Sequence, residues 1–378
     1  MAPIKNCLII GGGIGGMCAA IELAKRGVDV EMVEINQDWN VAGAGVTISG
    51  ATLRAFRQIG VMEEVLAKGG YWSEIDICHS DGRILKTMPM ERAVGSAEFP
   101  AASGILRPVL AEILRNATIR NGVKSRSGIT FKTITQDIAG VDVEFTDTTT
   151  GRYDLVIGAD GIQSKVRQII FPEAEKPKFT GQGCWRAIVP RTRLNSTILM
   201  GKTTKAGLNP VNDTQSYLFL LEKRSGTEFI APNRWPEILS DLLAEFGSPI
   251  QEFRDQLLND GTSAAASIIY RPLMGLMMKR PWHHGRVVLL GDAVHATTPH
   301  LAMGAGIAVE AALVLAEELF RCSSLEESLI AYINRRYDRA SLVVNSSLKL
   351  GEIEQYGGSV EEHYKIMYHA VHELTLPI

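Results

Sequence analysis

Three glycines near the N-terminus have the spacing of a dinucleotide-binding turn. Gly11, Gly13 and Gly16 follow a short apolar run and precede a segment whose apolar residues recur at helical spacing. In such a strand–turn–helix unit the glycines allow a tight turn and let a pyrophosphate approach bare backbone. The unpaired N–H groups and the dipole at the helix N-terminus attract its negative charge. The sequence therefore predicts a phosphate-binding turn that also includes Ile14 and Gly15.

An acidic residue follows this turn at the separation that a bound dinucleotide requires. Residues 28–34 alternate apolar and acidic side chains, which predicts a second strand ending at Glu34, roughly 20 residues after the last glycine. A carboxylate there can accept hydrogen bonds from ribose hydroxyls and would repel a 2′-phosphate. A solvated carboxylate at a strand end is the alternative interpretation. We therefore expect the tightly held dinucleotide to be FAD or NAD rather than NADP.

Two later apolar runs also end in aspartate, at Asp160 and at Asp292. An aspartate at the carboxyl end of a strand in an open α/β sheet faces the ligand crevice, and its oxygens can accept hydrogen bonds from a polyol. A turn or helix-cap aspartate is the alternative interpretation. The second run precedes a predicted helix from Gly304 to about Arg321, whose N-terminal dipole would stabilise negative charge on a bound ring.

These three motifs, in this order, resemble those of the class A, single-component flavoprotein monooxygenases. These are FAD-dependent aromatic hydroxylases with a p-hydroxybenzoate-hydroxylase-like fold, and the resemblance covers nearly the whole chain. It implies that Asp292 holds the ribityl chain of FAD and that Asp160 helps to bind both FAD and the nicotinamide cofactor. It also implies that Arg107, at the start of a helix, reaches the FAD phosphates. We expect further cofactor contacts from Gly45, Val46, Pro299, Gly304, Ala305 and Gly306.

The chain departs from the family pattern at two positions near the expected flavin ring. Met303 stands where the family often has glutamine before a glycine, and Ala311 stands where it often has aspartate. Backbone amides can still face the isoalloxazine, but side-chain contacts from these two positions are lost.

The resemblance implies an α/β fold, with a Rossmann-like FAD-binding domain, an inserted antiparallel β-sheet substrate domain and C-terminal helices. We expect the FAD-binding domain to comprise residues 1–72, 100–178 and 281–378, and the substrate domain residues 73–99 and 179–280. Short alternating strands and an Asp-Gly hairpin signal predict the inserted sheet.

Tyr217 is the candidate substrate-orienting residue. It alternates with Phe219 and Leu221 on one face of a predicted strand, where a phenol could bond a ring substituent and help to activate it. Core packing is the more common role of such a face. Arg186 lies on a neighbouring predicted strand, and residues 262–270 are predicted to form another.

Composition and charge exclude several classes of protein. Of 378 residues, 39 are Lys or Arg and 42 are Asp or Glu, without a long run of either sign, so a nucleic-acid partner is not expected. The five cysteines are widely spaced and predict neither a disulfide framework nor a metal site. The sequence has no apolar run long enough to span a membrane and no secretory signal pattern, so we expect a cytoplasmic protein.

The expected function follows from the resemblance. It implies an NAD(P)H- and FAD-dependent monooxygenase that uses NADH or NADPH and O2 to hydroxylate a small aromatic or heteroaromatic compound through a flavin C4a-hydroperoxide, as in aromatic compound catabolism. The single dinucleotide fingerprint fits a nicotinamide that binds only transiently. A halogenase or reductase of related fold and a non-catalytic FAD- or NAD-binding module are the alternatives. Residues 324–378 are predicted to be helical and could mediate a homodimer.

Overall fold

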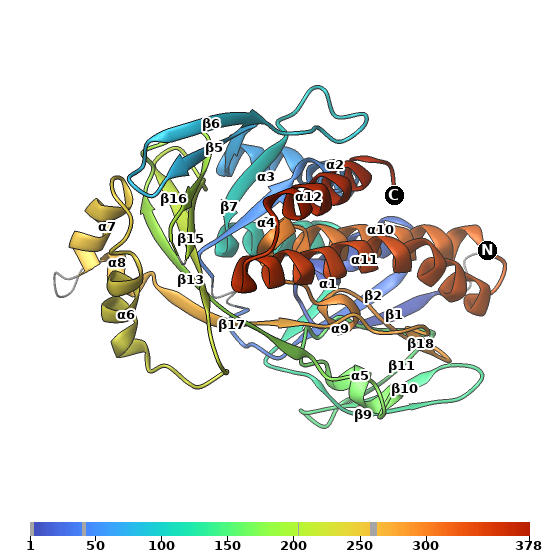
Figure 1. Cartoon of the computed structure of the whole chain (residues 1–378). Helices are drawn as coiled ribbons and strands as arrows, with labels where there is room; N and C mark the ends of the chain where they lie inside the picture. The colour runs from blue at the N-terminus through green and yellow to red at the C-terminus, as the bar shows by residue number, and fades with distance from the viewer. Residues whose placement is uncertain (1–3, 40–42, 203, 258–262) are drawn as a thin grey trace.

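The computed structural model begins with the βαβ unit that the glycine pattern predicts (Figure 1). Strand β1 (Asn6–Ile10), helix α1 (Ile14–Lys25) and strand β2 (Asp29–Glu34) follow one another, and β1 pairs in parallel with β2. The structure describes residues 4–39, 43–202, 204–257 and 263–378.

Strand β1 lies inside a six-stranded sheet with the strand order β18-β19-β12-β1-β2-β8. Its strands from β19 to β8 run parallel, and Ile9 of β1 lies between Met32 and Ile157 of the neighbouring strands. Only β18 is antiparallel. The strands added to β1 and β2 are β8 (Lys124–Ser127), β12 (Leu155–Gly158), β18 (His283–His284) and β19 (Val287–Leu289). Because parallel strands end at one edge, the residues that follow them gather there.

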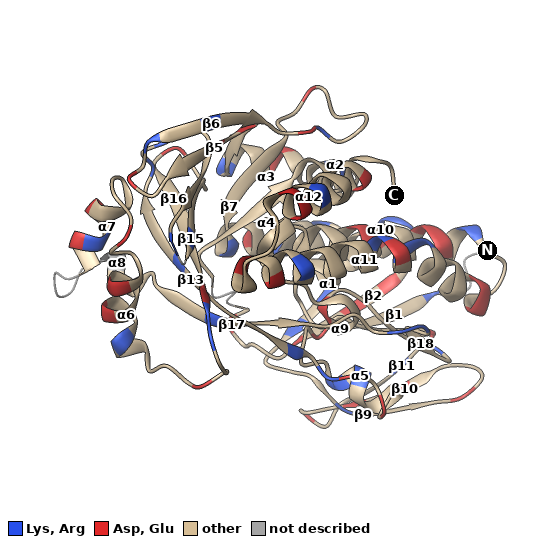
Figure 2. Ribbon diagram, in the orientation of Figure 1, with Lys and Arg blue, Asp and Glu red and all other residues tan. Residues whose placement is uncertain are grey.

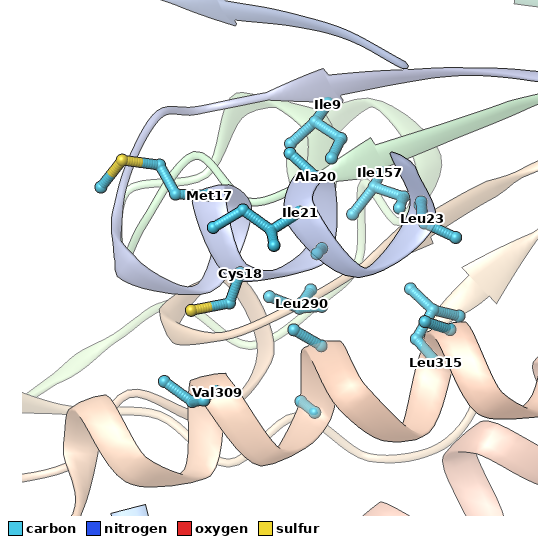
Figure 3. Packing of buried hydrophobic residues seen from close by; sticks show 14 of the residues in the cluster. Ile9, Met17, Cys18, Ala20, Ile21, Leu23, Ile157, Leu290, Val309 and Leu315 are labelled. Carbon is cyan, nitrogen blue, oxygen red and sulfur yellow. The ribbon is translucent and has the colours of Figure 1, made fainter. Parts of the chain in front are cut away.

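Helices α1 and α10 (Gly304–Arg321) pack against each other beside this sheet (Figure 3). Cys18 and Ile21 of α1 and Val309 of α10 are all fully buried. Helix α4 (Arg107–Arg120) also contacts α1. Burial of apolar area in this layer holds the N-termini of the three helices in fixed positions relative to the sheet edge.

A seven-stranded sheet forms the second layer, in the order β17-β13-β16-β15-β14-β5-β6. Its strands are β5 (Glu74–His79), β6 (Ile84–Pro89), β13 (Lys178–Pro190), β14 (Ser196–Met200), β15 (Lys205–Pro210), β16 (Gln215–Lys223) and β17 (Ile269–Gly275). Neighbouring strands are antiparallel, as predicted, except the parallel pair β14–β5. The β5–β6 hairpin reaches this sheet from a separate stretch of chain, so no tight turn fixes its direction. The division into two domains at the boundaries given above stays a prediction.

One face of the seven-stranded sheet is covered by α6 (Trp235–Leu242) and α7 (Ile250–Leu257), which bury Leu239 and Phe253 against it. The predicted strand over residues 262–270 is wrong in its first part. Helix α8 (Ser263–Ala266) precedes β17, which begins at Ile269, and Thr262 lies outside the described residues. The three alanines of this segment have high helix propensity, which outweighs the apolar pattern.

Two three-stranded sheets were not predicted from the sequence. One contains β3 (Gly45–Ser49), β4 (Gly70–Trp72) and β7 (Ala102–Leu106); the other contains β9 (Phe131–Gln136), β10 (Val141–Phe145) and β11 (Thr150–Tyr153). The remaining short elements are α2 (Gly50–Ile59), α3 (Met62–Lys68), α5 (Lys165–Ile170), η1 (Pro232–Arg234), α9 (Asp292–His295) and η2 (Pro299–Leu301).

The C-terminal residues are helical, as predicted, in α11 (Leu325–Tyr356) and α12 (Val360–Thr375). Figure 2 shows acidic and basic residues interspersed along these and other helices. Among the described residues, none of the helices combines the length and apolarity needed to cross a membrane.

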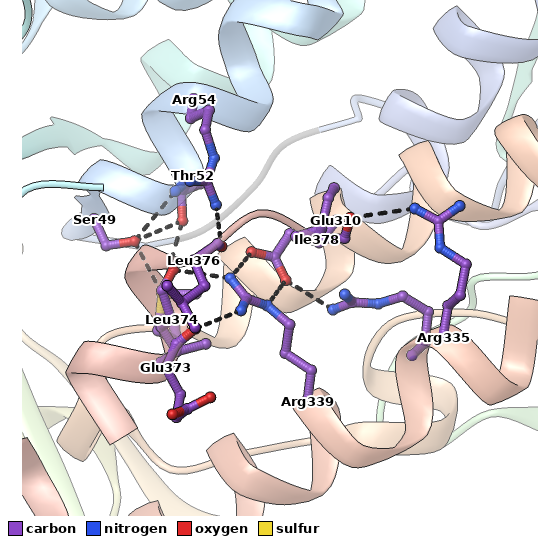
Figure 4. A network of polar contacts seen from close by, with 12 residues as sticks. Ser49, Thr52, Arg54, Glu310, Arg335, Arg339, Glu373, Leu374, Leu376 and Ile378 are labelled. Carbon is purple, nitrogen blue, oxygen red and sulfur yellow. Dashed lines mark hydrogen bonds and ion pairs between the residues drawn. The ribbon is translucent and has the colours of Figure 1, made fainter. Parts of the chain in front are cut away.

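A buried ion cluster ties the C-terminal helices to α10 (Figure 4). The Glu310 carboxylate accepts hydrogen bonds from Arg336 Nη2 at 2.8 Å and from Arg339 Nε at 2.8 Å. Arg339 also donates to the backbone oxygens of Glu373 and Leu374, at the end of α12. Burial opposes ionisation of Glu310, but the two arginines hold its pKa below the ordinary value. The cluster therefore joins α10 to α11 and α12 through oppositely charged groups inside the helical layer.

Replacing Glu310 by alanine should strongly destabilise the fold, because the buried Arg336 and the partly buried Arg339 lose their carboxylate. We expect a loss of about 3–5 kcal/mol in the free energy of unfolding, measured by urea titration. The control is Glu317→Ala, which removes a half-exposed partner of Arg335 and should cost about 1 kcal/mol or less. Equal stabilities of the two variants would contradict this role of Glu310.

Candidate cofactor and substrate site

A cavity of about 440 Å³ lies where the carboxyl edge of the parallel sheet meets the seven-stranded sheet. The glycine turn and the segment after β19 line one side, and β13, β16 and β17 line the other. Eleven residues predicted to contact the cofactor line this cavity: Gly13, Ile14, Gly15, Gly16, Gly45, Val46, Arg107, Asp292, Pro299, Gly304 and Ala305. Segments far apart in the sequence therefore share one continuous hollow.

The glycines of the turn have different physical roles. A Cβ added at Gly13 would meet no heavy atom within 4 Å, so this backbone faces open space. Gly11 has φ +110°, and its Cβ would lie 2.3 Å from the Ala159 oxygen. At Gly16 the Cβ would lie 2.1 Å from the Gly11 oxygen. Gly11 and Gly16 thus permit tight backbone packing, while Gly13 leaves room for a phosphate group.

Gly11, Glu34, Asp160 and Gly306 do not line the cavity, and their expected cofactor contacts stay predictions. Glu34 accepts hydrogen bonds from Gly12 N at 2.7 Å and Asn36 N at 2.9 Å. These bonds hold the carboxylate beside the glycine turn. A carboxylate accepting two bonds still has acceptor capacity for a ribose hydroxyl.

Asp160 and Gly306 support the elements around the cavity. Asp160 Oδ2 accepts from the backbone N–H groups of Lys165 and Val166, whereas its buried Oδ1 has no hydrogen-bond partner among the described residues. At Gly306 a Cβ would lie 2.3 Å from Thr52 Oγ1. Gly306 therefore allows α10 to approach α2 closely.

Arg107 and Asp292 face the cavity with their charges unpaired. Neither side chain forms a hydrogen bond or ion pair with a residue that the structure describes, and both are exposed to the cavity. Surrounding protein withdraws Asp292 from bulk water and raises its pKa, which Arg107 opposes. Desolvation by the surrounding protein and the nearby Arg186 lower the pKa of Arg107. Unsatisfied charges in an open hollow fit a ligand with phosphate and hydroxyl groups, as FAD has.

The two departures from the family pattern lie in packed interior. Met303 is buried against Ile307 and Leu301, and its sulfur accepts a hydrogen bond from Ser49 Oγ. Ala311 is fully buried in the main core. Neither residue lines the cavity. Backbone rather than side chain therefore faces the cavity where the helix α10 begins.

The sheet side of the cavity is aromatic, aliphatic and basic. Tyr217 lines it, and its hydroxyl lies 2.7 Å from Thr47 Oγ1 and accepts from Asn209 Nδ2 at 2.9 Å. Its ring lies against Gly45, where a Cβ would come within 2.1 Å of Tyr217 Cδ1. Gly45 thus makes room for the tyrosine, which bonds β3 to the seven-stranded sheet.

Sequence reasoning missed several lining residues: Thr47, Ile269, Arg271, Leu273, Thr297 and Thr298. The alternation of Ile269, Arg271 and Leu273 was a usable signal, because it places the three on one face of a strand. The predicted strand stopped at residue 270 and so hid it. With Arg107 and Arg186, Arg271 gives the described lining more positive than negative charge, which favours anionic ligand groups.

Comparisons with known proteins agree with this geometry. Residues 5–347 match the family described as FAD binding domain. The chain is 30% identical to 2-heptyl-3-hydroxy-4(1H)-quinolone synthase of Pseudomonas aeruginosa, covering 92% of this chain and 89% of that one. It is 26% identical to 6-hydroxynicotinate 3-monooxygenase of Pseudomonas fluorescens, covering 91% and 90%. Klebsiella pneumoniae HpxO, solved with FAD and uric acid, has the same fold, with TM-score 0.81, 21% identity and coverage of 98% and 92%.

A parallel sheet with a glycine turn at the edge of a cavity defines a dinucleotide-binding protein. The chain belongs to the FAD-binding family of class A flavoprotein monooxygenases, as the motif resemblance predicted. The fold class is therefore confirmed, and FAD is the cofactor of this family.

Replacing Asp292 by asparagine should weaken FAD binding, because a charged hydrogen-bond acceptor is lost. We expect the dissociation constant of FAD to rise at least about tenfold, as for one lost charge-assisted hydrogen bond. Quenching of flavin fluorescence on titration of the apoprotein measures it. The matched control is Asp338→Asn on the surface of α11, whose side chain is 88% exposed. An unchanged affinity of the Asp292 variant would refute the assigned ribityl contact.

Proposed function

We propose that the protein is an FAD-dependent monooxygenase that uses NADH or NADPH and O2 to hydroxylate a small aromatic or heteroaromatic compound. The observation that carries the proposal is the single cavity shared by the glycine turn, Asp292 and the sheet wall around Tyr217. A cytoplasmic location and a homodimer also belong to the proposal. The relatives support the substrate class, because a quinolone and a hydroxynicotinate are both aromatic N-heterocycles by name.

Bound FAD would supply the redox chemistry, passing electrons from the nicotinamide to O2 so that one oxygen atom enters the substrate. The protein would hold the cofactor through its own polar groups. N–H groups at the start of α1 and the Arg107 guanidinium would bind the pyrophosphate. Glu34 would accept from the ribose and Asp292 from the ribityl chain. The N-terminus of α10 would stabilise negative charge on the reduced ring.

The sheet wall would bind and orient the substrate. Ile269 and Leu273 offer apolar contacts to a planar ring, while Arg186 and Arg271 can pair with an ionised substituent. Tyr217 would orient the ring through its hydroxyl, which Thr47 and Asn209 already hold. Bound cofactor and substrate would exclude water from this space, which would limit the loss of activated oxygen as peroxide.

Two alternatives are separated by one experiment. A reductase or halogenase of related fold would not give hydroxylated product, and a non-catalytic module would not consume NAD(P)H. We expect purified protein with FAD to oxidise NADH or NADPH faster when particular aromatic compounds are added, with equal amounts of O2 consumed and hydroxylated product formed. Mass spectrometry with ¹⁸O₂ identifies the product oxygen. Protein that binds no flavin, or turnover without product oxygenation, would contradict the proposal.

Replacing Tyr217 by phenylalanine keeps the ring and removes the hydroxyl. We expect KM for the aromatic substrate to rise about tenfold and more peroxide to be released per NAD(P)H, because one orienting hydrogen bond is lost. The affinity for FAD should not change. Tyr153→Phe is the control, since Tyr153 lies outside the cavity lining and donates a comparable hydrogen bond to Glu31. A Tyr217 variant with unchanged KM and coupling would leave the residue only a packing role.

A further inference from the structure

A chain of polar side chains runs from the cavity to the surface behind η2. Thr298 lines the cavity, and its Oγ1 lies 2.8 Å from His300 Nδ1. His300 Nε2 lies 3.4 Å from Glu354 Oε2, an ion-pair contact rather than a hydrogen bond, and Glu354 Oε1 lies 3.2 Å from His363 Nε2. The His300 side chain is 1% exposed and that of His363 is 30% exposed. One end of the chain is therefore at the cavity and the other reaches solvent.

The surrounding backbone makes room for this arrangement. Gly351 lies inside the long helix α11, where a glycine is less favourable than alanine. A Cβ at this position would lie 2.9 Å from His300 Cε1 and 3.1 Å from His300 Nε2. The glycine thus lets the buried imidazole approach Glu354 on the same helix.

The proposed reaction consumes one proton from solvent in each cycle. NAD(P)H, H⁺, O2 and a substrate C–H give NAD(P)⁺, a substrate C–OH and water. Two electrons come from the nicotinamide and two from the substrate C–H bond. They reduce the two oxygen atoms, one of which enters the substrate while the other leaves as water. Once FAD and substrate fill the cavity, this proton still needs a route to the reacting oxygen.

We propose that His363, Glu354, His300 and Thr298 form this proton path, an inference that rests on the proposed function. His363 takes a proton from solvent and passes one from Nε2 to Glu354 Oε1. The carboxyl group of Glu354 then turns so that the protonated oxygen faces His300 and releases this proton to His300 Nε2, while His300 gives up its Nδ1 proton to Thr298 Oγ1. The hydroxyl proton of Thr298 moves into the cavity.

The charged groups around the path keep His300 neutral and Glu354 ionised between catalytic cycles. Burial lowers the pKa of His300, although Glu354 opposes this effect, and Lys205 on β15 and His363 on α12 lower it further. Burial alone would raise the pKa of Glu354, but His300, His363 and Lys205 hold it far below the ordinary value. His300 therefore rests as neutral imidazole and Glu354 as carboxylate near neutral pH, and each can hold the passing proton only briefly.

The test uses the outer end of the path, where a substitution leaves the core intact. In the FAD-loaded enzyme, His363→Gln should lower kcat about tenfold at pH 8 and increase the solvent isotope effect on kcat, because proton entry becomes slow. Added imidazole should restore kcat. KM and FAD affinity should stay unchanged. His372→Gln is the control, since His372 lies on the same helix, is 48% exposed and faces Glu91.

The outcomes separate the path from the function on which it rests. Lack of hydroxylation by the wild-type enzyme would overturn the proposed function and the path together. Wild-type hydroxylation with an unchanged His363→Gln enzyme would overturn the path alone. A loss of kcat that imidazole does not restore, with lower FAD affinity, would also overturn it and leave the four residues as a structural support. The inner variant His300→Gln should show the same isotope effect without rescue.

Discussion

The site depends on the parallel pairing of β1, β2, β12 and β19. Because these strands run the same way, their carboxyl ends meet at one edge of the sheet. The glycine turn after β1 and Asp292 shortly after β19 then lie along the same cavity, although they are far apart in the sequence. An antiparallel strand in the place of β19 would send Asp292 to the opposite edge. Every functional assignment in this cavity therefore depends on the parallel direction of these strands.

The second sheet closes the cavity and connects it to the first layer. Tyr217 fits against Gly45 and shares hydrogen bonds with Thr47 and Asn209, so the sheet wall is held to β3 by polar contacts as well as by packing. Behind the cavity, His300 of η2 lies beside Glu354 of the C-terminal helix α11. Glu310 holds those helices to α10, whose N-terminus faces the cavity. The C-terminal region thus supports the site as well as covering the sheet.

Local sequence signals were sufficient to predict those elements that are determined by residues close together in the chain. The βαβ unit, the helix from Gly304 and the C-terminal helices could be predicted because glycine spacing and helical periodicity act within a few residues. The parallel β14–β5 pair and the two small sheets could not, because their pairing joins distant segments. Thr298 was missed for the same reason, because only the tertiary fold brings it to the cavity, whereas Arg271 was missed because the predicted strand ended one residue too early. Glu354, the acidic partner of His300, likewise lies on a helix far along the chain.

A crystal structure of the protein grown with FAD would test the central claim most directly. The account predicts electron density for the pyrophosphate at the N-terminus of α1, beside Gly13, and for the ribityl chain within hydrogen-bond distance of Asp292. The isoalloxazine density would then lie between η2 and the wall of β13, β16 and β17. Density for the cofactor at another surface, with this cavity filled only by water, would contradict the account.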